Sequence, residues 1–448
     1  MRTQTSWTFL PTIIALLPRT VAAFGILTMS VASSGKGGAP RNIVVVGGGI
    51  QGTSVAYHLS QSPSLPSGSK ITLLEAKAPA SAASGKGGGF MARSWGDGGS
   101  TETLHHLAFD MYPKMAEELG CTTYRKLPVL SVRPGFKGEK GADHARKSRQ
   151  LGPLMPSWLD GQIGPVRAMG YGDDTAQITP SEFVHKMLER AGDVIEVKIG
   201  TCDGVETEQG SGRGERRITG VLCEGGEAAI PADAVIVSAG PWSCAAEDWF
   251  HGAVKLPMEG IKSTSIVWKK PEGGNEVDAT ALFCGENDRW NTHLEVYPRP
   301  DGTIYICGIG GSDYIGTDEL KAGAFREVCE ANESRVSAAS SSFKEISATY
   351  ATTGELDRVQ ACMRPCPPDA QPYMGKVPGF EGAFINAGHN CWGIAWAPAC
   401  GKAMAELVLE GESTSVDLDP FDPARYTPIP RRGGRGRKKK GADVGEQW

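Results

Sequence analysis

Residues 42 to 52 read Asn42-Ile43-Val44-Val45-Val46-Gly47-Gly48-Gly49-Ile50-Gln51-Gly52. An apolar strand therefore runs directly into a Gly-x-Gly-x-x-Gly turn and the start of a helix, an order typical of a dinucleotide-binding loop. Gly47 permits the tight turn, Gly49 lets the backbone approach a pyrophosphate, and Gly52 lets the helix pack against the strand. The pyrophosphate would lie at the positive N-terminus of that helix.

A second apolar strand, at residues 71–74, follows the helix and ends at Glu75. This order completes a βαβ unit and places Glu75 where a carboxylate hydrogen-bonds the ribose hydroxyls of a dinucleotide. Because a negative charge at this point would repel a 2′-phosphate, NADP is disfavoured. NAD and FAD both remain open at this stage.

The composition is that of an ordinary globular protein. The chain has 448 residues, of which 40% are apolar and 22% charged, and is long enough for two domains with separate cores. A net charge of −5 gives no reason to expect nucleic acid as a partner, and after the first forty residues no apolar run approaches the length of a membrane span. The eleven cysteines are scattered without any Cys-x-x-Cys, which argues against a disulfide scaffold and against a metal site.

Both ends of the chain differ from its middle. Residues 1–40 contain Arg2 and Arg19 but no acid, and residues 7–17 form a short apolar stretch, so we expect a targeting presequence. The plastid is the favoured destination, with the mitochondrion and the secretory pathway as alternatives. Residues 426–448 carry many Arg and Lys among Gly and Pro, which predicts a basic, disordered tail.

A second glycine-rich segment follows the ribose acid. Residues 80–90 read Ala-Ser-Ala-Ala-Ser-Gly-Lys-Gly-Gly-Gly-Phe, which is too rich in glycine for a strand or the interior of a helix. We expect a second loop that offers backbone amides to a ligand. NAD sites do not need such a loop close behind the ribose acid, whereas FAD has a ribityl chain and a flavin ring to cover. FAD is therefore the favoured cofactor.

With these features, the sequence resembles the FAD-dependent D-amino-acid, glycine and sarcosine oxidase family over residues 41–425. The resemblance implies an α/β fold, with a Rossmann-like FAD-binding domain of the glutathione-reductase type and an α+β substrate domain built on an antiparallel sheet. It assigns residues 41–105, 174–250 and 351–425 to the FAD-binding domain, and residues 106–173 and 251–350 to the substrate domain. Among the members of this family, the chain resembles most the eukaryotic ones without an assigned substrate.

Alternation of apolar residues predicts four antiparallel strands in the substrate domain. They are residues 263–269, 281–284, 293–297 and 303–307, with a hairpin turn at residues 298–302. Residues 320–346 are predicted to be helical, with a break around the serines.

The resemblance also implies which residues surround the FAD. Besides Glu75 they are Gly47, Gly48, Gly49, Ile50, Gln51, Gly52, Ala76, Ser84, Gly85, Lys86, Gly87, Gly88, Gly240, Trp242, Gly388, His389, Trp392, Gly393 and Ile394. The last five resemble the family's flavin-capping segment, where amides at a helix N-terminus stabilise negative charge near flavin N1 and the C2 carbonyl.

Three residues near the C-terminal end have further predicted roles. Arg364 lies where the glycine-oxidase branch has the arginine that binds the substrate carboxylate; the alternative is a structural arginine paired with Asp369. His389 is the candidate general base, and the alternative is a turn that contacts the flavin ring through its backbone. Cys362 stands seven residues before Asp369, the spacing at which the sarcosine-oxidase branch has a cysteine bonded to flavin; the alternative is a buried free cysteine.

The resemblance implies oxidation of the C–N bond of a small amino acid or secondary amine, with hydride transfer to flavin N5 and O2 as the acceptor. Two other functions stay open. The chain could be an amine or amino-acid dehydrogenase that passes electrons to a quinone or carrier protein, or a flavin-binding protein with a structural or trafficking role. A pyridine-nucleotide disulfide reductase is disfavoured because the sequence has no Cys-x-x-Cys and no second nucleotide loop.

Overall fold

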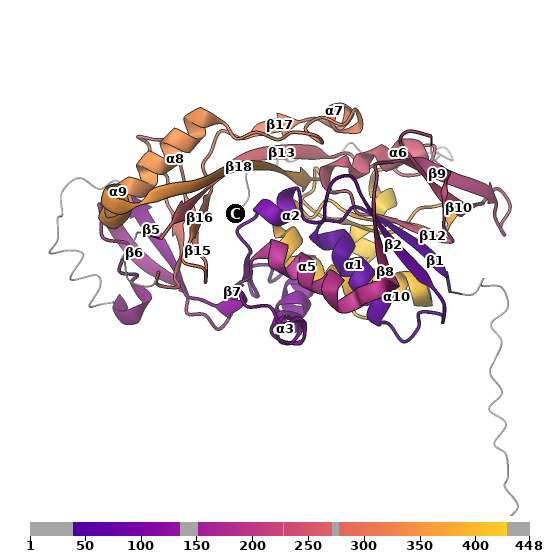
Figure 1. Cartoon of the computed structure of the whole chain (residues 1–448), viewed down its shortest axis with the longest axis horizontal. Coiled ribbons are helices and arrows are strands. Elements are labelled where there is room, and N and C mark those ends of the chain that lie inside the picture. The colour runs from indigo at the N-terminus through magenta and orange to yellow at the C-terminus, as the bar shows by residue number, and fades with distance from the viewer. Residues whose placement is uncertain (1–38, 135–150, 227, 271–276, 428–448) are drawn as a thin grey trace, which may run out of the picture. The chain divides into compact units, whose positions relative to one another are not determined.

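A computed structural model describes residues 39–134, 151–226, 228–270 and 277–427 (Figure 1). The predicted presequence, up to residue 38, and the predicted basic tail, from residue 428, lie outside these residues. Within the described ranges, no helix is long and apolar enough to cross a membrane.

A six-stranded sheet carries the predicted nucleotide loop. Its order is β19-β21-β12-β1-β2-β8, and the neighbouring strands are parallel except for β19 and β21. The strands are β1 (Asn42–Val46), β2 (Lys70–Glu75), β8 (Ile195–Ile199), β12 (Ala234–Val237), β19 (Tyr373–Lys376) and β21 (Ala383–Ala387). The central strand β1 is apolar from Ile43 to Val46 because Ile43 and Val45 face one core and Val44 and Val46 face the other.

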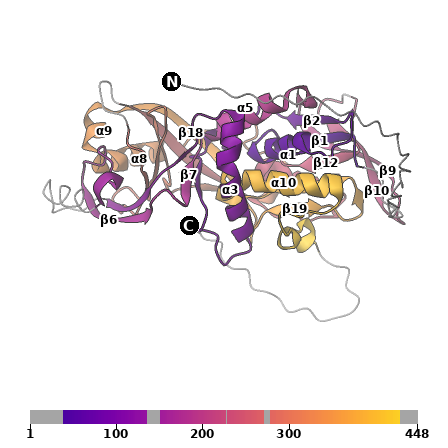
Figure 2. The ribbon, with the colours of Figure 1, turned by 90° about the horizontal axis from the view of Figure 1, so that it is seen from below.

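Helices cover one face of this sheet, and a smaller sheet covers the other (Figures 1 and 2). The helices are α1 (Ile50–Gln61), α3 (Glu102–Leu119), α5 (Pro180–Ala191) and α10 (Gly393–Glu410). The smaller sheet has β9 (Cys202–Gln209), β10 (Arg216–Cys223), β11 (Ile230–Pro231) and β20 (Phe380–Glu381), and α6 (Ala246–Trp249) packs in the same core.

An eight-stranded sheet forms the second part of the fold. Its order is β17-β13-β16-β15-β14-β5-β6, and β18 also pairs with β13. The strands are β5 (Val129–Pro134), β6 (Ile163–Gly170), β13 (Glu259–Lys269), β14 (Ala281–Cys284), β15 (Glu295–Pro298), β16 (Ile304–Cys307), β17 (Asp313–Ile315) and β18 (Glu355–Cys366). Its pairings are antiparallel apart from β5 with β14. The predicted α/β fold with an antiparallel-sheet second part is thereby confirmed.

Two helices, α8 (Glu333–Ile346) and α9 (Ala348–Thr353), cover one face of the eight-stranded sheet with Phe343, Tyr350 and their neighbours. A three-stranded sheet of β3 (Phe90–Ala92), β7 (Thr175–Gln177) and β4 (Arg125–Lys126) lies where the chain passes between the two large sheets. The short elements are α2 (Ala83–Lys86), α7 (Thr317–Lys321), η1 (Gly152–Leu154), η2 (Gly192–Val194), η3 (Gly240–Ala245), η4 (Asn390–Trp392), η5 (Asp419–Phe421) and η6 (Pro423–Tyr426).

The four predicted strands of the substrate domain are found as β13, β14, β15 and β16. The predicted helix over residues 320–346 is wrong in its first half, because α7 ends at Lys321 and α8 begins at Glu333. The predicted break around the serines is wrong as well, because α8 runs without interruption through Ser334, Ser337 and residues 340–342. Between them, Gly323 has a φ of +81° and Phe325 a φ of +55°, conformations that no helix accommodates. The predicted nucleotide-binding segment 351–425 begins with β18, which pairs with β13 and so belongs to the eight-stranded sheet. The chain re-enters the six-stranded sheet only at β19, which pairs with β21.

Candidate flavin and substrate site

The turn between β1 and α1 brings bare backbone to the edge of the six-stranded sheet. Gly47 has a φ of +108°, and a Cβ on it would lie 2.4 Å from the carbonyl oxygen of Ser238 at the end of β12. A Cβ on Gly52 would lie 1.9 Å from the carbonyl oxygen of Gly47, so this glycine lets the first turn of α1 close against its own loop. The N-terminus of α1 is therefore open to an anionic ligand.

The carboxylate of Glu75 is held in place at the end of β2. One oxygen accepts a hydrogen bond from the Gly48 amide at 2.7 Å, and the other accepts from the Lys77 amide at 3.0 Å. Glu75 and the following Ala76 line the same cavity as the glycine turn. This placement suits the predicted contact with ribose hydroxyls.

The second glycine-rich segment contains one turn of helix, α2, which the sequence analysis does not predict. The turn forms because the chain approaches itself closely at Gly85, where a Cβ would lie 2.0 Å from the Ala80 carbonyl oxygen. Ser84 of this turn accepts a hydrogen bond from the Ile50 amide at 2.8 Å and so joins the two glycine segments. The Lys86 ammonium points to the Ala361 carbonyl at 2.9 Å, on β18.

Gly87 and Gly88 join this segment to the second part of the fold. A Cβ on Gly87 would lie 2.6 Å from the Ile394 side chain at the start of α10. A Cβ on Gly88 would lie 2.6 Å from the ring of Tyr297 on β15. The absence of side chains at these positions thus allows the second glycine segment to lie between α10 and the eight-stranded sheet.

The N-terminus of α10 completes the cavity on a third side. The side-chain amide of Gln51 donates to the Gly393 carbonyl at 2.6 Å and accepts from Asn386 at 3.3 Å, which connects the first turn of α1 to β21 and α10. The Tyr112 hydroxyl donates to the carbonyl of Ile394. The positive end of this 18-residue helix is thereby directed at the cavity that Gly393 and Ile394 line.

His389 precedes that helix and is buried. Its Nε2 atom has no hydrogen-bond partner among the described residues, and the indole of Trp396 lies edge-on at 6.5 Å. Burial lowers the pKa of His389 to about 3, so the imidazole is neutral at physiological pH. Such a group is a weak proton acceptor, and the structure gives no support to the general-base role over the alternative of backbone contacts from this turn.

The turn after β12 borders the cavity with Gly240 and Trp242. The indole of Trp242 donates a hydrogen bond to the Ala324 carbonyl at 2.9 Å, in the segment between α7 and α8. This contact accounts for the interruption of the predicted helix, because the segment has to leave helical geometry to reach Trp242.

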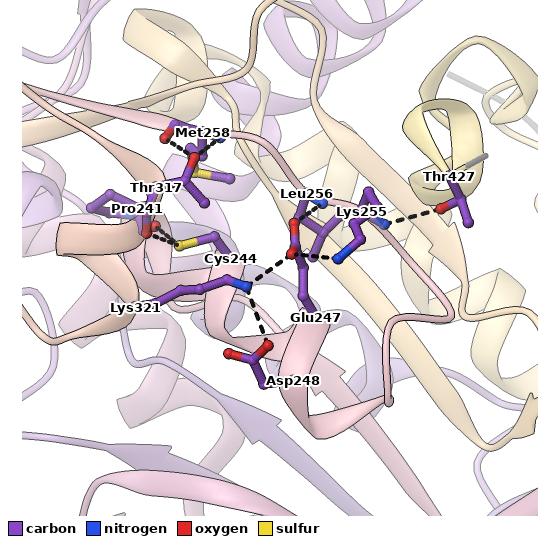
Figure 3. Close-up of polar contacts among 10 residues, drawn as sticks. All are labelled: Pro241, Cys244, Glu247, Asp248, Lys255, Leu256, Met258, Thr317, Lys321 and Thr427. Atoms are coloured by element: carbon purple, nitrogen blue, oxygen red, sulfur yellow. Dashed lines mark hydrogen bonds and ion pairs between the residues drawn. The ribbon is translucent and has the colours of Figure 1, made fainter.

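An ion-pair cluster behind this turn fixes it to α7 (Figure 3). The buried carboxylate of Glu247 accepts from Lys321 at 2.8 Å, from Lys255 at 3.3 Å and from the Leu256 amide at 2.6 Å. Lys321 also contacts Asp248 at 3.2 Å. Burial alone would raise the pKa of Glu247, but the hydrogen bonds from Lys321 and the Leu256 amide outweigh it and hold the pKa below its ordinary value. The cluster is structural, and it gives the turn a rigid base.

Arg364 on β18 faces the cavity from the side of the eight-stranded sheet. Its Nε atom is buried without a hydrogen-bond partner, and no carboxylate of the described residues lies within 4.0 Å of the guanidinium. Asp369, the partner that the structural alternative requires, is instead bound by Arg425 through two hydrogen bonds of 2.8 and 3.1 Å. The Cys391 thiol is a hydrogen-bond partner of the guanidinium, but no carboxylate among the described residues pairs with it, so Arg364 remains available for an anionic ligand.

Cys362 lies two residues before Arg364 on the same face of β18 and also borders the cavity. Burial raises the pKa of its thiol to about 11, so the group is protonated at neutral pH. A neutral thiol is a poor nucleophile, which favours the free-cysteine alternative.

An aromatic wall of the cavity, of which only Trp392 is predicted from the sequence, lies next to the second glycine segment. Five aromatic residues, Phe90, Trp95, Phe283, Tyr297 and Trp392, line it together with Glu295. The rings are in mutual contact, with centroid distances of 5.3 Å between Phe90 and Phe283 and 5.1 Å between Trp95 and Phe283. One signal in the sequence points to this wall: a single carboxylate, Glu295, interrupts the apolar strand around it.

Most of the predicted site residues meet at one cavity of about 400 Å³, a size within the range of small-molecule sites. Gly47, Gly49, Ile50, Gln51, Glu75, Ala76, Ser84, Gly87, Gly88, Gly240, Trp242, Cys362, Arg364, Gly388, His389, Trp392, Gly393 and Ile394 border it. Gly48, Gly52, Gly85 and Lys86 do not border it and instead shape the two glycine segments. The hydroxyl of Ser238, which follows β12, is buried there without a hydrogen-bond partner in the part of the chain that the structure describes.

These residues fit an extended dinucleotide with a flavin ring. The open N-terminus of α1 and Glu75 suit a pyrophosphate and a ribose, and the cavity continues past the second glycine segment to the N-terminus of α10 and to Arg364. A parallel nucleotide-binding sheet joined to an antiparallel sheet around such a site defines a flavin-dependent oxidoreductase.

The chain belongs to the family of FAD-dependent oxidoreductases designated DAO, whose model matches residues 42–407. It is thus an FAD-dependent enzyme, and FAD is its cofactor. An oxidoreductase of Schizosaccharomyces pombe is 27% identical over 402 residues, which cover 86% of this chain and 98% of the relative. The glycine oxidase of Pseudomonas aeruginosa is 26% identical over 400 residues, which cover 86% of this chain and 99% of the relative.

Solved structures share the fold. The crystal structure of glycine oxidase from Geobacillus kaustophilus matches with a TM-score of 0.63 at 17% identity and covers 86% of this chain and 99% of that chain. The L-amino acid deaminase of Proteus myxofaciens matches with a TM-score of 0.65 at 17% identity and covers 88% of this chain and 95% of that chain.

Proposed function

We propose that this enzyme oxidises the C–N bond of a small amino acid or of a secondary amine that carries a carboxylate, with O2 as the electron acceptor. The amine loses a hydride from carbon and a proton from nitrogen, and the resulting imine is hydrolysed by water. FAD, when bound, supplies the two-electron acceptor for the hydride. The protein supplies the position of the substrate and a cation for its carboxylate.

The main support for this proposal is that Arg364 borders the cavity without a carboxylate partner in the part of the chain that the structure describes. Its guanidinium borders the cavity, has an unpaired buried Nε and has no carboxylate partner among the described residues. A guanidinium in this state suits a carboxylate, which it can bind through two parallel hydrogen bonds. A flavin-binding protein with a purely structural or trafficking role would have no need for it.

The aromatic wall supports the same proposal. Phe90, Trp95 and Phe283 line the same cavity as Arg364 and give it an apolar wall, and charge interactions are stronger beside apolar surface than in water. Substrate size is limited by the same rings, so we expect small amino acids rather than peptides.

The first experiment is an absorbance spectrum of the purified chain before and after acid precipitation. We expect flavin bands at about 380 and 450 nm, and release of the yellow colour into the supernatant. Colour that stays in the pellet would contradict noncovalent binding and identify Cys362 as the residue to replace. A colourless protein that cannot be reconstituted with FAD would refute the proposal.

The second experiment is anaerobic reduction of the flavin by a panel of amino acids and secondary amines, each with and without its carboxylate. We expect bleaching only with carboxylate-bearing amines, and oxygen consumption with hydrogen peroxide formation when air is admitted. Bleaching without oxygen consumption would assign the dehydrogenase alternative, with a quinone or carrier protein as the acceptor.

The role of Arg364 is tested with Arg364→Lys and Arg364→Ala. Loss of a carboxylate partner at a partly buried site should reduce kcat/KM by about a hundredfold or more in the alanine variant, mainly through KM. Arg358→Ala is the matched control, because Arg358 lies on the same strand but is exposed and outside the cavity. An Arg364→Ala enzyme with unchanged kinetics would remove the basis of the proposal.

A further inference from the structure

Glu295 has no role in the function proposed above, yet its carboxylate borders the cavity. It lies on β15 opposite Cys307 of β16. The Tyr297 hydroxyl donates to one of its oxygens, and the Cys307 thiol lies 3.5 Å from the same oxygen. No cation of the described residues lies within ion-pair distance of it. Glu295 is thus an anion at the cavity wall without a counter-charge.

Arg364 borders the same cavity as Glu295, and the two side chains form no ion pair. Burial alone would lower the pKa of Arg364, but Cys391, Cys366, Glu295 and Cys307 together outweigh it and raise the pKa above its ordinary value. Burial raises the pKa of Cys391 to about 11 and that of Cys366 to about 12, so both thiols are neutral at pH 7. Burial raises the pKa of the Cys307 thiol as well, so among these four neighbours of the guanidinium Glu295 is the one carboxylate.

The surroundings of Glu295 also favour a cation. The ring of Tyr297 stacks on Phe90 at 5.5 Å, and the ring of Phe283 lies edge-on to Tyr297 at 6.0 Å. Aromatic faces carry partial negative charge and attract ammonium groups. One end of this part of the cavity therefore suits an anion, at Arg364, and the other suits a cation, at Glu295.

We propose that Glu295 binds the cationic nitrogen of a zwitterionic substrate while Arg364 binds its carboxylate. The inference rests on the proposed function, because it takes Arg364 as the carboxylate site. The substrate class is then an amino acid with one carboxylate and one ammonium group, which binds in this form and releases a proton to solvent to give the neutral amine; this amine then loses a hydride to FAD and a second proton to solvent, which leaves the imine. A second carboxylate on the substrate is disfavoured, because it would meet the charge of Glu295.

A pair of ligands of equal shape tests the charge directly. Glycine betaine has a carboxylate and a permanent positive charge, and 3,3-dimethylbutanoate has the same carboxylate with a neutral tert-butyl group in place of the trimethylammonium. Neither carries an N–H group, so neither can form an imine. The dissociation constants of both are measured on the FAD-containing protein by calorimetry and by the shift of the flavin absorbance.

We expect the wild type to bind glycine betaine about tenfold more tightly than 3,3-dimethylbutanoate, as one charge interaction at a partly buried site implies. Glu295→Gln should weaken glycine betaine and tighten 3,3-dimethylbutanoate, so that the preference disappears. Glu295→Asp keeps the charge and should keep the preference. Glu196→Gln, a change at an exposed position of β8 outside the cavity, should behave as the wild type.

The results separate this inference from the proposed function. If Arg364→Ala abolishes binding of both ligands while Glu295→Gln leaves their ratio unchanged, the carboxylate site stands and the role of Glu295 is refuted. A wild type that binds the two ligands equally well refutes it in the same way. If neither ligand binds to the wild type, both the role of Glu295 and the carboxylate site at Arg364 are refuted.

Discussion

Arg425 and Asp369 offer a direct test of the assignment of Arg364, because the structure gives Asp369 a partner other than Arg364. The Arg425 guanidinium binds both oxygens of Asp369, at 2.8 and 3.1 Å, and lies 4.0 Å from the centre of the Tyr373 ring. It also donates to the carbonyl oxygen of Gln371 at 2.7 Å. These contacts attach the segment after α10 to the loop that follows β18.

The loss of stability expected when the Arg425–Asp369 pair is broken follows from the burial of the two side chains. The Arg425 side chain is 16% exposed and that of Asp369 is 34% exposed, so the interaction lies between a surface pair and a fully buried one. We expect Arg425→Ala to lower the free energy of unfolding by about 2 to 3 kcal/mol, because it removes a bidentate pair, a carbonyl contact and a cation–π contact. Arg425→Lys keeps the charge but not the fork of donors, and should cost about half as much.

Two double-mutant cycles isolate the pairs. Equilibrium unfolding in urea, with a fixed excess of FAD, is measured for Arg425→Ala, Arg364→Ala, Asp369→Asn and both double variants. Arg425 and Asp369 should show a coupling energy of about 1 to 2 kcal/mol, and Arg364 and Asp369 less than about 0.5 kcal/mol. A larger coupling in the second cycle would mean that Arg364 is a structural partner of Asp369, and the substrate role argued from the absence of a carboxylate partner would be refuted.

Three further outcomes are expected. Burial alone would raise the pKa of Glu406, but hydrogen bonds from Lys402 and from the loop after α10 outweigh it and lower the pKa to about 2. The contribution of Glu406 to the free energy of unfolding is therefore complete above pH 4.5 and is lost as the pH falls toward 2. Urea unfolding between pH 6 and pH 3 should show a shallower loss of stability in Glu406→Gln than in the wild type. Since the pKa of His389 is lowered to about 3 by burial, His389→Asn should leave the midpoints of the pH profile of kcat/KM unchanged above pH 5; a midpoint that moves would restore the general-base role. Gly88→Ala places a methyl group 2.6 Å from the Tyr297 ring and should weaken FAD binding about tenfold or more, as measured by flavin fluorescence on dilution. Gly285→Ala is the control: the nearest neighbour of its methyl group would be 3.9 Å away, so FAD binding should not change.

The cofactor half of the fold could be predicted from the sequence because its signals are local. The glycine turn, the strand that ends at Glu75 and the strand at residues 234–237 each depend on residues close together in the chain. The structure arranges them as parallel neighbours in the order β12-β1-β2. Local periodicity also located β14 at Ala281–Cys284, the same residues that the alternation predicts.

The break between α7 and α8 could not be predicted from the local sequence pattern. Residues 320–328 have helical periodicity, but the chain leaves the helix at Lys321 to bring the Ala324 carbonyl within reach of Trp242. The next helix begins only where Asn332 caps it, by accepting the Ser334 amide at 3.0 Å. The cap is visible in the sequence, whereas the contact across 82 positions of the chain is not.

The substrate end of the site depends on such distant contacts almost entirely. Whether Arg364 is free could not be decided from its spacing to Asp369, because Arg425, 56 positions further along, binds that carboxylate. The strand at residues 293–297 is predictable, but only the closure of the eight-stranded sheet over the glycine segments turns Glu295 toward the cavity that Arg364 borders. Cofactor binding in this chain thus follows from a contiguous motif, whereas in the function proposed above substrate choice follows from two opposite charges that the fold brings to one cavity. Substrate specificity could therefore change through single substitutions at either charge, without any change in the nucleotide loop that identifies the family.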